Sequence, residues 1–139
     1  MNIRPFDEKD RSAVIALWRA CELVKPQNNP DRDIDRKLAV GRELFLVAER
    51  GGEIIASVMA GYEGHRGWIN YLAVAPTHRR QGLGETMMAA AEQVLRAAGC
   101  PKINLQIRDS NLEVIAFYRA IGYLEDPVKS MGKRLESDQ

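Results

Sequence analysis

The stretch from Arg79 to Gly84 combines side-chain types and spacing that could bind an anion. It follows the apolar run Leu72-Ala73-Val74 and reads Arg79, Arg80, Gln81, Gly82, Leu83, Gly84. A helical spacing of apolar residues begins at Leu83, so the two glycines stand where a helix starts. The first N–H groups of a helix lack partners and lie at the positive end of its dipole, and glycine lets an anion approach them. The pattern predicts a binding site for a phosphate or a pyrophosphate.

Two common phosphate-binding motifs do not fit this turn. The dinucleotide fingerprint requires a third glycine where this chain has Met87, and the Gly-Lys-Ser/Thr run of a P-loop is absent from the sequence. What remains is the pattern Arg79-x-x-Gly82-x-Gly84 directly after a strand. The chemistry of the turn leaves one alternative open, a strand-to-helix turn that binds nothing.

A second group of candidate residues lies further along the chain. Asn111 stands at the start of a helical stretch, Tyr118 follows seven residues later, and Gly122-Tyr123 closes the stretch. About two turns of helix separate Asn111 from Tyr118, so both side chains can face the same end of a cleft. The alternative is that Tyr118 is an aromatic residue on the buried side of an amphipathic helix.

Together the two patterns resemble the signatures of the GNAT N-acetyltransferase family, Arg/Gln-x-x-Gly-x-Gly/Ala and a later Asn…Tyr…Gly-Phe/Tyr. The resemblance covers nearly the whole chain from Leu44 onward, and the order of elements most resembles the short bacterial members of YpeA type. It implies an α/β (α+β) fold, a mixed central sheet of six to seven strands with helices on both faces. It also implies that two parallel strands splay apart and that the thioester arm of acetyl-CoA lies between them.

The resemblance implies a role for each residue that matches the motifs. The backbone of Leu72, Ala73 and Val74 would pair with the pantetheine arm, and the Val74 N–H would stabilise charge on the acetyl oxygen. The main-chain N–H groups from Arg79 to Gly84 would cradle the pyrophosphate. Asn111 would contact the pantetheine region, and the Tyr118 hydroxyl would protonate the departing thiolate. The implied reaction is direct transfer of acetyl from acetyl-CoA to an amine acceptor, a small molecule or a protein or peptide amine, in a ternary complex.

An amine acceptor is mostly protonated at neutral pH, so the reaction needs a base or a water relay. Ribosomal-protein N-terminal acetyltransferases of the family carry this base as the Glu of Leu-Glu-Val-Arg-x-Ser-Asn, where this chain has Gln106. Gln106 cannot accept a proton, which counts against that function. The strand at 68–74 offers only Asn70 and Tyr71. Three weak candidates for the base remain, and each is more readily interpreted as a solvated loop residue: Glu22, Glu63 and His65.

Apolar spacing indicates the elements that must position these residues. The first part of the chain predicts a strand at 2–6, a helix that Asp7 caps, and a short second helix that Asn29 and Pro30 cap. Three antiparallel strands follow at 44–48, 54–62 and 68–74, with a hairpin turn at residues 50–53. The rest predicts a helix at 83–98, a parallel strand at 102–108, a helix at 112–121 and a last strand or hairpin within 123–135.

Length and composition exclude several classes of protein. The 139 residues suit one domain with a sizeable core, and we expect residues 1–139 to form it. A net charge of +1 without a basic stripe argues against nucleic acid and membrane surfaces as partners. Cys21 and Cys100 show no metal-ligand spacing, so we expect reduced thiols and no metal. The sequence shows no membrane-span-length apolar run and no signal-peptide core, which favours a cytoplasmic protein.

Two functions stay open from the sequence. One is an N-acetyltransferase, favoured by Tyr118 and the intact phosphate turn. The other is a non-catalytic acyl-CoA-binding sensor or interaction module of the same fold, favoured by the missing carboxylate base. The identity of the acceptor and the oligomeric state, including a homodimer, are left open.

Overall fold

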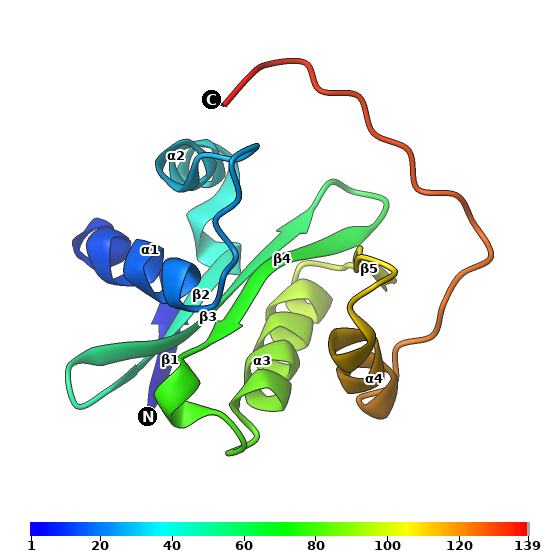
Figure 1. Cartoon of the computed structure of the whole chain (residues 1–139). Helices are drawn as coiled ribbons and strands as arrows, with labels where there is room; N and C mark the ends of the chain where they lie inside the picture. Colours follow the sequence, from blue (N-terminus) through cyan, green and yellow to red (C-terminus); the bar gives the residue numbers. More distant parts are fainter. Residues whose placement is uncertain (139) are drawn as a thin grey trace. The chain divides into compact units, whose positions relative to one another are not determined.

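A computed structural model describes residues 1–138 of the chain (Figure 1). The chain forms two compact units, one of residues 1–104 with Asp138 and one of residues Leu105–Ser137. The first unit contains the sheet and helices α1 to α3, and the second contains helix α4 (Leu112–Ala120). Each unit is described by itself below.

The first unit is built on a five-stranded sheet with the order β1-β2-β3-β4-β5. Strands β1 to β4 pair antiparallel, and β5 pairs parallel to the start of β4. The predicted three antiparallel strands and the parallel crossover after them are therefore confirmed. Gly51 and Gly52 make the turn between β2 and β3 with φ of 58° and 81°, which only glycine adopts readily. The strands are β1 (Asn2–Pro5), β2 (Phe45–Arg50), β3 (Glu53–Tyr62), β4 (Gly67–Val74) and β5 (Ile103–Asn104).

Five strands are fewer than the six to seven that the resemblance implies. The strand expected at 102–108 forms only at Ile103–Asn104, which pairs with Gly67 and Trp68. The strand or hairpin expected within 123–135 does not form, so that prediction was wrong. The apolar residues there recur every third or fourth position instead of every second, and Pro127 interrupts them. Their side chains are 75–92% exposed: Leu124, Val128, Met131 and Leu135.

The two N-terminal helices begin where their capping residues predict. Asp7 accepts from the N–H of Lys9 and forms a capping box with Asp10, which starts the short 3₁₀ helix η1 (Glu8–Asp10) and then α1 (Arg11–Ala20). Asn29 accepts from the N–H of Arg32 at 3.2 Å and starts α2 (Pro30–Gly41). The 3₁₀ helix η2 (Arg42–Leu44) then leads into β2.

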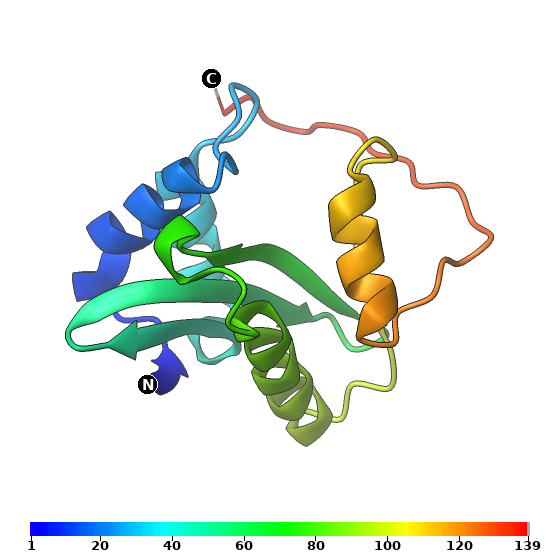
Figure 2. The same ribbon diagram turned by 60° about the horizontal axis from the view of Figure 1, so that its bottom comes forward.

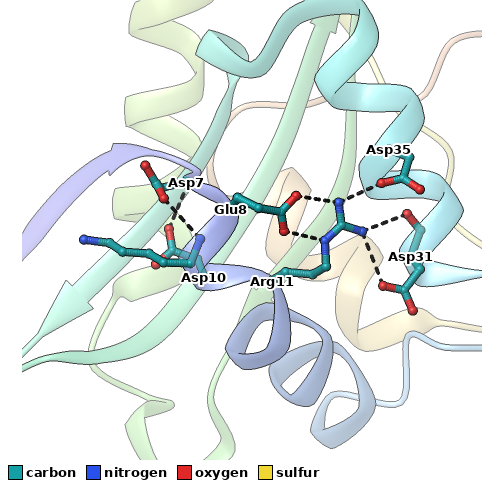
Figure 3. Close-up of polar contacts among 7 residues, drawn as sticks. Asp7, Glu8, Asp10, Arg11, Asp31 and Asp35 are labelled. Atoms are coloured by element: carbon teal, nitrogen blue, oxygen red, sulfur yellow. Dashed lines mark hydrogen bonds and ion pairs between the residues drawn. The ribbon is translucent and has the colours of Figure 1, made fainter.

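Arg11 ties the second helix to the first (Figure 3). Its guanidinium donates to the Glu8 carboxylate at 2.6 and 2.9 Å and to the Asp35 carboxylate at 2.7 Å. It also donates to the backbone and side-chain oxygens of Asp31 at 3.2 and 3.3 Å. A rigid guanidinium holds carboxylates in a fixed geometry. Arg11 therefore fixes the first turns of α2, which carry Asp33 between Asp31 and Asp35.

Helices cover both faces of the sheet, as the resemblance implies (Figure 2). Helices α1 and α2 lie on one face, where Trp18, Ile34 and Phe45 are fully buried in one cluster. Helix α3 (Leu83–Ala97) lies on the other face, against β2, β3 and β4. Its predicted apolar stripe is buried at Leu83, Met87, Ala91 and Leu95. The helix was expected to extend to Ala98, which lies just past its end and is exposed.

Candidate active site

The turn from Arg79 to Gly84 has the backbone geometry of an anion site. After the 3₁₀ helix η3 (Pro76–His78), Arg80 and Gly82 take left-handed φ angles of 64° and 74°, and α3 begins at Leu83. Gly82 is the N-cap, and its backbone oxygen accepts from the N–H and the hydroxyl of Thr86 at 3.1 and 3.0 Å. The N–H groups of the first helical turn therefore point out of the helix toward the turn.

The side chains of this turn divide into anchors and exposed groups. Leu83 is buried under the sheet, so only its backbone is available to a ligand. Arg79 and Arg80 are exposed, and the Arg79 Nε lies 3.4 Å from the backbone oxygen of Val74. Gln81 is also exposed and accepts from Arg50 at 3.3 Å. Two arginines beside a helix N-terminus give the positive charge that a phosphate requires.

Strand β4 has an open edge just before this turn. Its parallel pairing with β5 stops at Trp68, and within the described residues no strand continues it along Ile69–Val74. The N–H of Ala75 donates to Ile55 of β3 at 2.8 Å. Because successive N–H groups of a strand point to opposite edges, the N–H of Val74 points to the open edge. The open edge includes Leu72, Ala73 and Val74, whose pairing with a pantetheine arm stays a prediction.

A β-bulge interrupts β4 at the start of this open edge. Ser57 pairs with Ala73 and Met59 pairs with Asn70, so β4 has one residue more than β3 between these pairs. Tyr71 lies in the bulge with a φ of 52°, which a tyrosine rarely adopts. The bulge turns Tyr71 toward the face that α1 and α2 cover, because its ring stacks on Trp18 at a centroid distance of 3.7 Å.

Buried hydrogen bonds hold the bulge in place. The indole N–H of Trp18 donates to the Ser57 hydroxyl at 2.9 Å, and that hydroxyl donates to the backbone oxygen of Tyr71 at 2.9 Å. Trp18 and Ser57 are fully buried. No sequence pattern predicts this contact between Trp18 and Ser57, because the two residues lie far apart along the chain.

The hydroxyl of Tyr71 meets two polar side chains from the N-terminal helices. It donates to the Asp33 carboxylate at 2.6 Å and accepts from the Asn28 amide at 2.5 Å. Burial, followed by the hydrogen bond to Asp33, raises the pKa of Tyr71 well above its ordinary value. Asp33 and Asn28 were not predicted as site residues, because no spacing rule places either of them beside a residue of β4.

The second unit contains the other two predicted site residues. Asn111 is the N-cap of α4, and its side-chain oxygen accepts from the N–H of Val114 at 3.3 Å. Tyr118 is buried, with Phe117 and Tyr123 packed edge-on against its ring at 5.0 and 5.5 Å. Burial raises the pKa of Tyr118 to about 12, so its hydroxyl keeps its proton at neutral pH. The amide of Gln106 donates to the Ser130 hydroxyl.

The loop candidates for a base have structural roles or none. Glu63 accepts from the backbone N–H groups of Arg66 and His65, which closes the turn between β3 and β4 and lowers the Glu63 pKa. Glu22 is exposed in a left-handed conformation just past the end of α1. Among residues 1–138, no group of three or more His, Cys, Asp or Glu side chains is placed to hold a metal ion. Within the same residues, no helix is long and apolar enough to cross a membrane.

A cavity of about 650 Å³ lies beside the site, on the side of α1. It reaches Ala75 and Pro76, directly after Val74, and is lined by Ala13 and Ala16 of α1. The ion pair of Arg4 with Asp10, at 2.7 Å, forms part of its wall. None of the residues predicted to bind a ligand lines this cavity, so we assign it no part in the reaction.

Several known proteins resemble this chain in sequence or in fold. Acetyltransferases of Sodalis glossinidius and Pectobacterium atrosepticum are each 46% identical to this chain, and each match covers 100% of the chain and 99% of the relative. The solved aminoglycoside 6'-N-acetyltransferase of Acinetobacter haemolyticus shares the fold with a TM-score of 0.72 at 19% identity, over 98% of this chain and 100% of that one. Residues 12–123 match the model of the acetyltransferase (GNAT) family. The chain therefore belongs to the acetyltransferase (GNAT) family.

Proposed function

We propose that this protein transfers the acetyl group of acetyl-CoA to an amine. The observation that carries the proposal is the open edge of β4, which leads within a few residues into the turn at Arg79–Gly84 and the N-terminus of α3. An extended pantetheine arm can pair with free N–H and C=O groups of a strand edge. The pyrophosphate at the other end of the arm then meets the N–H groups of a helix N-terminus.

Each of the predicted cofactor-binding residues has a role in this proposal. Leu72, Ala73 and Val74 present their backbone to the arm, and the Val74 N–H stabilises the negative charge that develops on the acetyl oxygen. The backbone from Arg79 through Gly84 holds the pyrophosphate, with Arg79 and Arg80 supplying charge. The acetyl-CoA is a co-substrate, and the proposal requires no metal.

The second unit supplies a proton donor in this proposal. Tyr118 keeps its proton at neutral pH, so it can donate to the thiolate that leaves as coenzyme A. Asn111 contacts the pantetheine region in addition to capping α4. We further propose that residues 1–139 act as one N-acetyltransferase domain in the cytoplasm.

Calorimetric titration with acetyl-CoA tests the phosphate turn. We expect Gly82→Val to weaken binding at least tenfold, about 1.4 kcal/mol, because its side chain stands where the pyrophosphate approaches. Valine is also strained at the Gly82 φ of 74°, so the matched control is Gly99→Val, with a φ of 90° in equally open space. The control carries a similar strain just past the opposite end of α3. Equal affinity in Gly82→Val and the parent would overturn the binding site.

Turnover then separates an enzyme from a module that only binds acetyl-CoA. Release of the coenzyme A thiol is measured with a panel of amines, namely spermidine, kanamycin and a peptide with a free N-terminal alanine. The aminoglycoside is included because a protein of the same fold acetylates that class. Acceptor-dependent release supports the enzyme. Tight binding without release for any member of the panel supports the alternative of a non-catalytic sensor or interaction module.

A further inference from the structure

The proposed reaction requires a group that removes a proton from the acceptor amine. The sequence position where ribosomal-protein N-terminal acetyltransferases carry a glutamate is Gln106 here, and the Glu63 carboxylate is engaged by the backbone of its own turn. A carboxylate nevertheless reaches β4 from a different element. Asp33, in the first turn of α2, accepts the hydroxyl proton of Tyr71 at 2.6 Å.

The hydroxyl of Tyr71 has one lone pair that its two hydrogen-bond partners do not use. A phenol donates one proton and can accept at two lone pairs. Its proton goes to Asp33 and one lone pair is taken by the Asn28 amide, which leaves a lone pair that can accept a proton from an ammonium group. Tyr71 is half-buried, and it immediately precedes Leu72, which begins the stretch of β4 proposed to hold the acetyl-CoA arm.

The hydroxyl is held in place from several directions. The ring stacks on Trp18 with an interplanar angle of 10°, and the backbone oxygen of Tyr71 accepts from Ser57. Asp33 is also held, because its Oδ1 lies 3.5 Å from the guanidinium of Arg36. A proton relay depends on such preorganised geometry, since transfer requires heavy atoms at hydrogen-bond distance.

The charges around the pair determine which group can act as the base. Tyr71 itself cannot, because burial and the hydrogen bond to Asp33 raise its pKa and keep it neutral. Asp33 supplies the carboxylate, with the Arg36 guanidinium 3.5 Å away on α2, and the buried Asp138 pairs with Arg36 at 2.8 Å. The Asp33 side chain is 24% exposed, so a proton that it receives can pass on to water.

We propose that Tyr71 and Asp33 form a proton relay that receives the acceptor as a primary alkylammonium group. One N–H bond of the ammonium breaks as its proton moves to the Tyr71 oxygen, and the Tyr71 proton moves to Asp33 Oδ2. The freed nitrogen lone pair attacks the acetyl carbon, the carbon–sulfur bond breaks, and the electron pair leaves with the sulfur, which takes a proton from Tyr118. The relay rests on the proposed acetyl transfer, with Tyr71 as the catalytic group and Asp33 acting through it.

Two conservative variants and a matched control test the relay. Tyr71→Phe keeps the stack on Trp18 and removes the hydroxyl, and Asp33→Asn keeps the shape and removes the charge. We expect both to lower kcat by about 10²–10⁴-fold, the range of a general base, with less than about a twofold change in acetyl-CoA affinity. Asp35→Asn removes the same charge from the same helix. Its amide oxygen can still accept from Arg11, and Asp31 still ties α2 to Arg11, so kcat should stay near the parent value.

The pH profile distinguishes the relay from a structural role. In the parent, kcat/KM with the best acceptor of the panel should be nearly flat between about pH 6 and 8, since the bound ammonium is deprotonated within the site. In Tyr71→Phe and Asp33→Asn only free amine can react. For an acceptor amine with a pKa near 10.4, as in a lysine side chain, kcat/KM should then rise about tenfold per pH unit in that window. For a peptide α-amino group, with a pKa of about 7.7–8.0, the same rise should level off near pH 8.

Each result has a defined meaning. Acceptor-dependent turnover in the parent, together with near-parental rates and profiles in Tyr71→Phe and Asp33→Asn, would overturn the relay and leave the proposed function standing. Binding of acetyl-CoA without turnover for any amine in the panel would overturn the proposed function and the relay with it. Loss of turnover in Asp35→Asn as well would show that substitutions in α2 lower turnover by disturbing the helix and not by removing the Asp33 carboxylate. That result would also contradict the relay.

Discussion

Ser57→Ala is the substitution for which the structure predicts a large effect from the loss of a single atom. The Ser57 hydroxyl accepts from the buried indole N–H of Trp18 and donates to the backbone oxygen of Tyr71, both at 2.9 Å. Alanine keeps the Cβ and removes only the oxygen. The substitution therefore leaves one donor and one acceptor without their partner, inside the element that shapes the β4 bulge.

The size of the effect follows from the burial of the two groups. Trp18 is fully buried, and a buried donor without a partner costs about 1–3 kcal/mol. The backbone oxygen of Tyr71 belongs to a residue that is only half-buried. Loss of the hydrogen bond to this oxygen should therefore cost about the net value of an ordinary hydrogen bond, about 0.5–1.5 kcal/mol. We therefore expect Ser57→Ala to lower the free energy of unfolding by about 1.5–4.5 kcal/mol, a large part of the roughly 5–15 kcal/mol typical of a domain.

Urea unfolding monitored by circular dichroism measures this loss, and a double-mutant cycle assigns it. In a Trp18→Phe background there is no indole N–H that could lose its partner. Ser57→Ala should therefore cost only about 0.5–1.5 kcal/mol of stability there. The coupling energy should then be about 1–3 kcal/mol. Ser12→Ala, at an exposed position of α1, is the control and should change stability by less than about 0.5 kcal/mol.

Two results would refute this reasoning. A loss in Ser57→Ala no larger than that of the Ser12→Ala control would mean that the hydroxyl does not satisfy the two groups. An equal loss in the parent and in the Trp18→Phe background would mean that the Trp18 hydrogen bond contributes nothing. If the reasoning holds and Ser57→Ala still folds, its kcat should fall together with its stability, since the strained backbone of Tyr71 loses its support.

Other variants test the remaining assignments. Tyr118→Phe should keep acetyl-CoA affinity and thermal stability while kcat falls by about 10–10⁴-fold, and a parental kcat would remove Tyr118 from the mechanism. Cys21→Ser and Cys100→Ser should retain parental turnover, because both thiols are free and neither has an assigned role; a collapse of turnover with intact folding would contradict this. The hydrogen bonds from Arg4 lower the pKa of the buried Asp10 carboxyl. The Asp10 carboxylate therefore stabilises the fold at pH values above its unfolded pKa of about 3.9, and this stabilisation is lost as the pH falls below that value. In urea titrations, Asp10→Asn should therefore be less stable than the parent by about 1.5–3 kcal/mol at pH 7, and the gap should narrow below about pH 4; a gap that does not depend on pH would contradict the pairing.

Short-range features of the fold could be predicted from the sequence because each depends on residues a few positions apart. Asp7 and Asn29 start helices by bonding the next N–H groups, Gly51 and Gly52 adopt the φ angles of a hairpin turn, and the glycine at 82 ends the turn before α3. The spacing of apolar residues also predicted that α3 begins at Leu83, whereas phosphate binding by the turn before it stays a prediction. The strand or hairpin expected within 123–135 did not form. Its apolar residues do not alternate every second position, so a strand there would have no apolar face to bury against the rest of the protein.

The surroundings of Tyr71 were decided by the tertiary structure alone. Trp18, Asn28, Asp33 and Ser57 come from three other parts of the chain and meet Tyr71 only after α1 and α2 have packed on the sheet. The bulge that turns Tyr71 toward them arises from the register between β3 and β4, which is a property of two paired strands. A local pattern contains no information about such pairings, because the hydrogen bonds that stabilise them join residues that are adjacent only in space.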